Sequence, residues 1–388
     1  MPASVSASVP VDRDPRRLWW WLSAALPLGA LLNLMRWLDS GATLWLWAMP
    51  AFTYLLLPLL DALLARDQRN LSAPARAALD GAWRYRLLVV AYVPLQLATL
   101  ALGCWIAVQH GAALSPAAWL GLILTVGGVT GVGINTAHEL GHRSVAWERA
   151  LARLALAPTL YGHFQVEHNR GHHRRVATLD DPASARMGES FWAFLPRVML
   201  GSVRSAWALE SRRLAAAGHG AWHWRNYNLQ SWSLSVLLLA ALVAALGPAV
   251  LPFFLVQALY GASLLEVVNY IEHYGLKRAP GPGGAPQRVT PQHSWNSAHA
   301  VSNLFLFQLQ RHSDHHANPG RRFQLLDHAA DAPQLPSGYP GMLLLAYVPP
   351  LWFVVMNPRV LAHYGGDIER AQLHPPCAAA LRRRHALP

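Results

Sequence analysis

Six long apolar segments constrain the fold of this chain more than any other feature. They run over residues 18–38, 42–65, 87–109, 117–137, 231–247 and 249–270. Each is about twenty residues long, the length that a helix needs to cross the hydrocarbon core of a bilayer. Only 13% of the 388 residues are charged, whereas soluble proteins average about 25%. The sequence therefore predicts an all-α integral membrane protein with a bundle of six transmembrane helices.

The basic residues predict how this bundle is oriented. The loop at 66–86 contains five arginines, whereas the turns at 39–41, 110–116 and 247–248 contain no Lys or Arg. Because basic loops stay on the cytoplasmic side, we expect both termini in the cytoplasm and the protein in a bacterial inner membrane. The first segment follows three arginines, but its apolar core is longer than that of a signal peptide, so we expect a retained helix. The formal charge of +12 then reflects topology and attraction to anionic lipid, not nucleic-acid binding.

The remaining segments predict a helical cap on the cytoplasmic side. We expect tails at 1–17 and 358–388, with one membrane domain over 18–357 between them. Within it, cytoplasmic segments begin near 138 and 271, with helices over 147–163 and 189–217, a flexible loop at 278–292 and a last helix from about 335 to 356 that could lie against the membrane. The two cysteines, Cys104 and Cys377, are too few for a four-cysteine iron site.

Nine of the nineteen histidines fall into four short clusters, HELGH, EHNRGHH, NYIEHYG and RHSDHH. Histidines three or four residues apart lie on one face of a helix, and neutral imidazole is a common metal ligand. The predicted topology brings all four clusters to the cytoplasmic edge of the bundle. Nine ligands are too many for one metal. The candidate ligands are His138, His142, His168, His172, His173, His273, His312, His315 and His316.

The spacing alone leaves several metal sites open. HELGH matches the zinc-protease pattern H-E-x-x-H, but one tetrahedral zinc uses about four ligands. A metal transporter without enzymatic activity is a further alternative. Imidazole suits iron, zinc, copper and nickel alike. Two irons are favoured because the adjoining apolar bundle indicates a hydrocarbon substrate, and breaking an unactivated C–H bond requires oxygen activated at a redox metal.

Three of the clusters read H-x3-H, H-x3-HH and H-x2-HH, the pattern of membrane di-iron oxygenases and desaturases. Longer strings resemble the alkane 1-monooxygenase family over about 55–345, namely DPASARMGES at 181–190, NYIEHYGL at 269–276, HSWNSAH at 293–299 and LQRHSDHHA at 309–317. The resemblance implies two non-haem irons on the nine histidines and O2-dependent hydroxylation of n-alkanes to 1-alkanols. It also implies two electrons from rubredoxin in trans, supplied by an NAD(P)H-dependent reductase. A fatty acyl desaturase and a xylene-type monooxygenase are the nearest alternatives.

Several acidic residues are candidates for orienting a metal-bound imidazole through its outer N–H. Four lie beside a proposed ligand, and two lie near the inner ends of their spans, where an ionisable group is a functional candidate. His293 and His299, in HSWNSAH, are candidates of the same kind. The six acidic residues are Glu139, Glu167, Glu272, Asp314, Glu266 and Asp61.

Two further predictions concern the substrate and the electron donor. Thr53 lies eight residues outward of Asp61, or about 12 Å along a helix. In the resembled family a bulky residue near this place limits chain length, so the small Thr53 predicts tolerance for longer alkanes. Arg143, Arg170, Arg174 and Arg175 flank the histidines and could dock an acidic electron donor. Their alternative role is positive-inside topology or contact with lipid headgroups.

Overall fold

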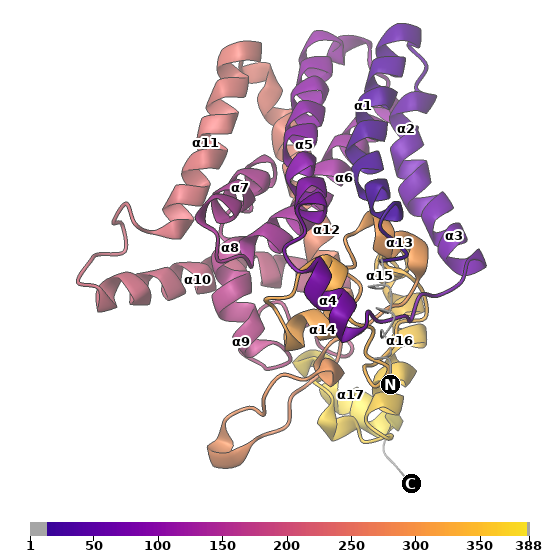
Figure 1. The fold of residues 1–388 in the computed structure, drawn as a ribbon, viewed down its shortest axis with the longest axis vertical. Helices are drawn as coiled ribbons and strands as arrows, with labels where there is room; N and C mark the ends of the chain where they lie inside the picture. The colour runs from indigo at the N-terminus through magenta and orange to yellow at the C-terminus, as the bar shows by residue number, and fades with distance from the viewer. Residues whose placement is uncertain (1–13, 386–388) are drawn as a thin grey trace, which may run out of the picture.

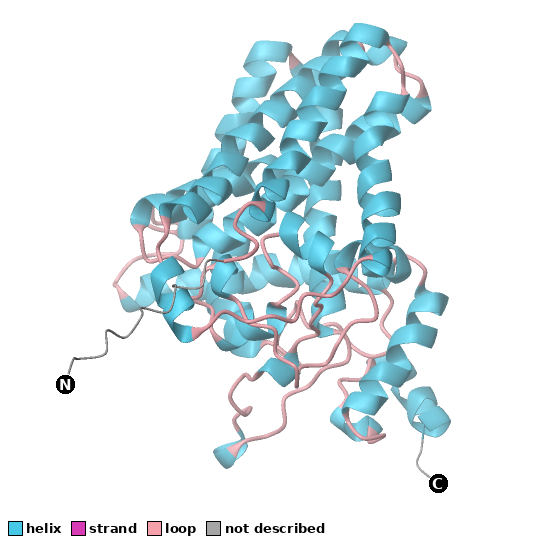
Figure 2. Ribbon diagram, turned by 45° about the vertical axis from the view of Figure 1, so that its right-hand side comes forward, coloured by secondary structure: helices cyan, strands magenta, loops and turns pink. Residues whose placement is uncertain are grey.

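The computed structural model describes residues 14–385, so most of the predicted N-terminal tail lies outside the described residues. Within this range the regular secondary structure is helical, and the only β contacts are four isolated bridges. Long helices form one half of the molecule, and short helices and loops form the other (Figure 2). The predicted all-α class is confirmed.

Within residues 14–385, five helices are long and apolar enough to cross a membrane, which identifies an integral membrane protein. They span Leu44–Leu63, Trp83–Gln109 (α5), Pro116–Gly141 (α6), Tyr227–Leu246 (α11) and Pro248–His273, of which Leu251–His273 is α12. The first predicted span corresponds to α1 (Leu22–Ser40), which includes Arg36 and Asp39 and is not among the five. It packs against α5 and the next helix along the chain (Figure 1).

The helix over Leu44–Leu63 contains an irregular turn. It consists of α2 (Leu44–Ala51), a π-helical turn over Phe52–Leu56 and α3 (Leu57–Leu63). The Leu57 N–H bonds to the Phe52 carbonyl, five residues back. Pro58 has no N–H with which to resume the α-helical pattern at once. Such π turns often occur at functional sites, and this one contains Thr53.

Glycines bring α6 and α12 close together. A Cβ on Gly127 would lie 2.9 Å from the Gln257 carbonyl oxygen, and one on Gly131 would lie 3.0 Å from that of Gly261. Small residues allow two membrane helices to pack backbone to backbone. Because the two helices run together to their C-terminal ends, His138 and His273 come to the same end of the bundle.

The cap differs from the prediction in two helices. The first, α7, covers Ala146–Leu156 and is shorter than predicted, because a 3-10 turn and Leu160 with a φ of +57° follow it. By contrast, α10 covers Phe191–Ala216 and nearly matches the predicted 189–217. The predicted last helix is two helices, α15 (Tyr339–Ala346) and α16 (Pro349–His363). The pair Pro349-Pro350 starts the second one.

The C-terminal segment is part of the folded cap. The predicted boundary at 357 falls inside α16, and Val360, Tyr364 and Leu381 are buried in the same core as Tyr270 of α12. The last helix, α17 (Ala378–His385), packs beneath α16 (Figure 1). Residues after 357 therefore help to fix the C-terminal end of α12, which carries His273.

Candidate metal centre

All nine predicted histidines come together, and they form two groups. His138, His142, His168, His173 and His315 form the first group, and His172, His273, His312 and His316 form the second. In each group the possible ligand atoms lie within 4.8 Å of one another. The rings of His173 and His316 are 4.5 Å apart, so the two groups are adjacent. The arrangement provides two neighbouring metal sites.

A π-helical turn decides how the second histidine cluster divides. Residues Glu167–His172 form the turn, and α9 (His173–Arg175) continues from it. In an α-helix, His168 would share a face with His172. In the π turn the backbone hydrogen bonds join residues five apart, so His168 instead faces His173, and the Nε2 atoms of these two histidines are 2.9 Å apart. His172 turns to the other group, where its Nε2 lies 3.2 Å from that of His316.

The last cluster divides by ordinary α-helical spacing. It lies on α14 (His312–Ala317), where the Nε2 atoms of His312 and His316 are 2.8 Å apart. His315 points to the first group, and its Nε2 is 2.8 Å from that of His138 at the end of α6. The second and last clusters therefore each contribute to both groups. The two sites cannot form independently of each other.

The histidines have the properties that metal ligands require. Burial, followed by the neighbouring imidazoles, holds the pKa of His312, His315 and His316 well below its usual value. Neutral imidazole keeps the lone pair that binds a metal. The buried Nε2 of His142 has no hydrogen-bond partner among residues 14–385, although buried polar atoms normally have one. Five and four converging imidazoles fit two iron ions.

Asp181 orients one of these histidines, and the sequence analysis did not select it. Its Oδ2 is 2.9 Å from His172 Nδ1 and also accepts a 2.6 Å hydrogen bond from the Ser184 hydroxyl. Burial opposes ionisation, but His172 and Ser184 lower the pKa of Asp181 to about 2. Carboxylates in this position fix the ring and increase its basicity. The string DPASARMGES contained Asp181, but nothing in it indicated contact with His172.

We expect Asp181→Asn to weaken metal binding, because a neutral amide is a poorer partner for the His172 N–H. Loss of such a contact typically costs about 10- to 100-fold in metal affinity or activity. Iron content after dialysis against a graded chelator series measures the effect. Asp180→Asn is the matched control, since Asp180 is exposed. Equal iron retention in the two variants would contradict this role for Asp181.

One of the six predicted acidic residues contacts a proposed ligand. Glu272 Oε2 lies 3.1 Å from His312 Nε2, and its Oε1 accepts a hydrogen bond from Tyr339. The other five contact other residues. Three form ion pairs with arginines: Glu139 with Arg143, Glu167 with Arg175 and Asp314 with Arg321. Two accept hydrogen bonds: Glu266 from Tyr161 and Asn269, and Asp61 from the Ser302 N–H. His293 bonds to Thr290 and Gln287, and His299 bonds to Ser297. These residues support the surrounding chain rather than the imidazoles.

The position of Glu139 bears on the zinc-protease alternative. In that mechanism the glutamate of H-E-x-x-H acts as a general base on metal-bound water. Here the Glu139 carboxylate lies 2.9 Å from the Arg143 guanidinium. The arrangement is that of a structural ion pair, not of a base that faces the histidines.

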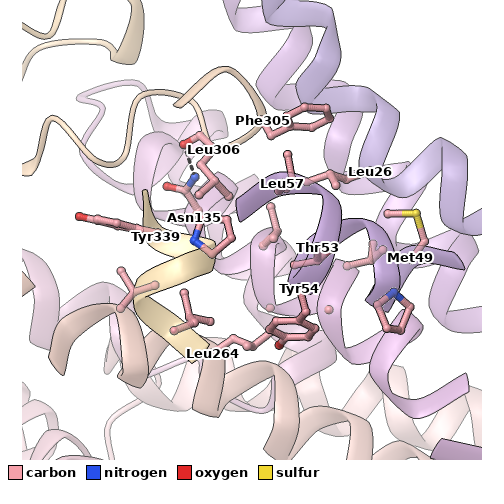
Figure 3. Close-up of a pocket in the computed structure, with 18 of the residues that line it drawn as sticks. Leu26, Met49, Thr53, Tyr54, Leu57, Asn135, Leu264, Phe305, Leu306 and Tyr339 are labelled. Carbon is pink, nitrogen blue, oxygen red and sulfur yellow. Dashed lines mark hydrogen bonds between the residues drawn. The ribbon is translucent and has the colours of Figure 1, made fainter. Parts of the chain in front are cut away.

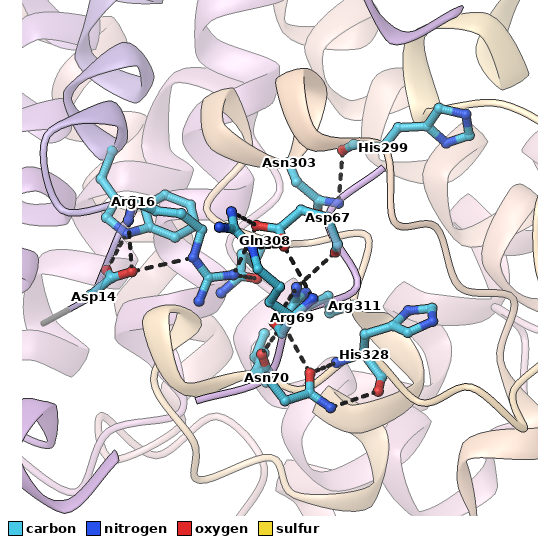
Figure 4. A network of polar contacts seen from close by, with 12 residues as sticks. Asp14, Arg16, Asp67, Arg69, Asn70, His299, Asn303, Gln308, Arg311 and His328 are labelled. Atoms are coloured by element: carbon cyan, nitrogen blue, oxygen red, sulfur yellow. Dashed lines mark hydrogen bonds and ion pairs between the residues drawn. The ribbon is translucent and has the colours of Figure 1, made fainter. Parts of the chain in front are cut away.

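Arg311, the residue before α14, fixes the start of this helix. Its guanidinium donates to the carbonyl oxygens of Leu326 at 2.7 Å, Asp67 at 3.0 Å and Arg69 at 3.1 Å, and the residue is 1% exposed. One side chain therefore ties two other loops to the helix that carries three candidate ligands (Figure 4).

The turn before Arg311 is strained and is held by the same network. Phe307 and Gln308 have φ angles of +52° and +53°, a region that is unfavourable for L residues. The Gln308 amide donates to the Phe323 carbonyl, and its oxygen accepts from Arg16 (Figure 4). Arg16 is held in turn by Asp14. The start of the described chain thus helps to shape the metal centre.

The four predicted docking arginines occupy different environments. Arg143 is buried, and it donates to the carbonyls of Gly320 and Arg321, so its guanidinium does not face solvent. This corrects its predicted place on a docking face. Arg170 pairs with Glu210 and Arg175 with Glu167, whereas Arg174 is exposed.

An open depression reaches the first histidine group from the cap. It has a volume of about 460 Å³, and its lining includes His142 and His173, the two least buried members of the nine. Arg149, Arg153 and Arg170 also line it. No sequence pattern indicated Arg149 and Arg153, which lie on α7 between the first two histidine clusters. The depression is therefore cationic and leads to the candidate metal centre.

An apolar cavity of about 110 Å³ approaches the histidines from the membrane side (Figure 3). Thr53 lines it, as do Met49 and Leu57 of the same interrupted helix. Its inner end includes Asn135, one turn before His138, and Leu309, three residues before His312. The cavity can hold an apolar chain with one end near the metal centre.

Comparisons with known proteins agree with this geometry. A fatty acid desaturase family model matches residues 113–346, which contain all nine histidines. Alkane 1-monooxygenase of Acinetobacter baylyi is 40% identical over 96% of this chain and 92% of its own length. Alkane 1-monooxygenase 1 of Alcanivorax borkumensis is 41% identical over 93% and 89%.

A more distant relative matches less of the chain. The hydroxylase component of xylene/toluene monooxygenase from Pseudomonas putida is 30% identical over 61% of this chain and 63% of its own length. The relatives that match nearly the whole chain, including the histidine groups and the cavity, are alkane 1-monooxygenases. This chain therefore belongs to the alkane 1-monooxygenase family.

Proposed function

We propose that this protein hydroxylates the terminal methyl group of n-alkanes to give 1-alkanols. The observation that carries the proposal is an apolar cavity whose lining includes Asn135 and Leu309, each three residues before a member of the two histidine groups. One oxygen atom of O2 enters the alcohol and the other leaves as water, which consumes two electrons and two protons. The cavity supplies regioselectivity, because a chain confined in it presents its end to the metals.

Two non-haem irons are the proposed cofactors, and they supply the reductive activation of O2 that C–H cleavage requires. The nine histidines hold them. Asp181 keeps His172 in the ligand orientation by accepting its Nδ1–H. Apolar side chains around the cavity exclude water from the reacting carbon.

We further propose the topology that the basic loops predict. In this proposal there are six spans, with α1 as the first, both termini are cytoplasmic by the positive-inside rule, and the membrane is a bacterial inner membrane. The membrane hydroxylase domain begins at 18 and includes the C-terminal helices, which share its core beyond the predicted boundary at 357. Membrane lipid is then a partner over most of the bundle, and the n-alkane reaches the cavity from the lipid.

Reduced rubredoxin is the proposed electron donor. It acts in trans and is reduced again by an NAD(P)H-dependent reductase. The cationic depression beside His142 and His173 supports this proposal, because it is the open approach to the histidines and its arginines attract an acidic protein. We propose it as the docking site, with Arg170 at its edge and Arg174 nearby. Arg175 is engaged by Glu167 and contributes less charge.

We expect rubredoxin-dependent turnover to weaken as ionic strength rises, because salt screens the attraction. Arg153→Gln should raise the KM for rubredoxin and flatten its salt dependence, with kcat at saturating rubredoxin unchanged. Arg359→Gln is the matched control, since Arg359 is an exposed arginine on α16. A salt-independent KM in the unmodified protein would argue against electrostatic docking.

The decisive test combines iron quantification with product analysis. Purified protein is reconstituted with rubredoxin, its reductase, NADH and O2, and is given n-alkanes from octane to hexadecane. We expect about two irons per chain and 1-alkanol as the product. One zinc per chain would instead favour the protease alternative, and labile mixed metals a transporter. Absence of 1-alkanol from every alkane would overturn the proposed function.

A further inference from the structure

Two tyrosines in the lining of the apolar cavity contact each other. The hydroxyl groups of Tyr54, in the π turn, and Tyr260, on α12, lie 2.5 Å apart and form a hydrogen bond. Both side chains line the cavity, and both are partly exposed. Figure 3 shows Tyr54 beside Thr53 in the cavity wall. The pair therefore joins two helices that are far apart in sequence, across the cavity wall.

The residues next to this pair are exposed apolar side chains, as expected of a surface that faces lipid. Leu55 and Leu56 follow Tyr54 and are 69% and 44% exposed, and Leu259 precedes Tyr260 and is 57% exposed. Tyr260 lies thirteen residues before His273, or about 20 Å along the helix at 1.5 Å per residue. This depth is within the hydrocarbon core, which is about 30 Å thick. An alkane dissolves in this region of the bilayer.

The chemistry of the pair suits a closure that opens and shuts. A hydroxyl in an apolar environment is costly unless it is hydrogen-bonded, so the two tyrosines hold each other in place. An alkane passing between them breaks the bond and offers no replacement. The bond re-forms once the chain has passed, which closes the cavity behind it. The π turn places Tyr54 here, because it rotates the following residues relative to a regular helix.

We propose that Tyr54 and Tyr260 form a lateral gate through which the alkane enters the cavity from the lipid. This proposal rests on the proposed function, since the molecule that passes the gate is the alkane substrate. It makes the two tyrosines determinants of substrate access rather than catalytic residues. Their hydrogen bond sets how often the gate opens, and a long chain, which needs the gate open for longer, is affected more than a short one.

Tyr54→Phe and Tyr260→Phe test the gate, because each removes one hydroxyl and keeps the ring. A neutral hydrogen bond contributes about 0.5–1.5 kcal/mol, so its loss should raise kcat/KM for hexadecane about two- to tenfold, with kcat and iron content unchanged. The double variant should match Tyr54→Phe, because Tyr54→Phe breaks the same bond and also removes the interaction between the Tyr54 and Tyr347 hydroxyls. Tyr92→Phe is the control, because Tyr92 also donates one buried hydrogen bond, to Val129, away from this pair.

The outcomes separate the gate from the function on which it rests. If the unmodified protein forms 1-alkanols and both variants behave as Tyr92→Phe does, only the gate is overturned. A fall in kcat for octane and hexadecane alike would also overturn it, because that pattern indicates a structural role. If the unmodified protein forms no 1-alkanol, the proposed function and the gate fail together.

Discussion

Replacing His273 with alanine should abolish alkane hydroxylation and remove about one iron per chain. His273 is one of four imidazoles in the second group, it is fully buried, and its Nε2 lies 3.3 Å from that of His312. Loss of a carboxylate that merely orients a ligand costs about 10- to 100-fold. Loss of the ligand itself should cost more than about 100-fold in turnover. Iron analysis and 1-octanol formation measure the two effects.

The control for this variant is His299→Ala. His299 is also a buried imidazole, at 5% exposure, but it bonds to Ser297 and lies outside both groups. Deleting it creates a similar cavity, so any general loss of stability appears in both variants. Thermal unfolding of the metal-free proteins compares them directly. Full iron content and full activity in His273→Ala would remove His273 from the metal centre.

The sequence predicted the convergence of the histidines for a sound physical reason. Hydropathy located the spans because a bilayer demands about twenty apolar residues, and the spans ending at His138 and His273 run in the same direction. Their clusters therefore had to meet at one end of the bundle. The division of the nine histidines into groups of five and four was not predictable in this way. It depends on a π turn at 167–172 that no local sequence pattern indicates.

Long-range contacts also escaped the sequence analysis. Asp181 is nine residues from His172 in sequence, and only the fold brings its carboxylate to the ring. Arg311 reads as one more cationic residue beside a cluster, yet it is buried among backbone carbonyls from two other loops. Arg143 was likewise predicted to be a surface charge, because its sequence position beside a cluster does not indicate that it is buried. Identity and spacing indicate what a side chain can do, whereas burial decides which of those roles it has.

Replacing Thr53 with tryptophan should shorten the range of alkanes that the protein accepts. Thr53 lines the cavity within the π turn, so a tryptophan there fills the space that a long chain would occupy (Figure 3). Forcing extra bulk into occupied space typically costs about 1–3 kcal/mol. We therefore expect hexadecane turnover to fall by about tenfold or more, since each 1.4 kcal/mol is a factor of about ten. Octane turnover should persist.

The matched control for chain length is Leu55→Trp. Leu55 belongs to the same turn but is 69% exposed and does not line the cavity, so its replacement adds the same ring on the lipid side. The ratio of 1-octanol to 1-hexadecanol from a mixture of the two alkanes measures the effect. That ratio should rise in Thr53→Trp and stay unchanged in Leu55→Trp. An unchanged ratio in both would mean that the chain does not pass Thr53, and the cavity in Figure 3 would then not hold the substrate.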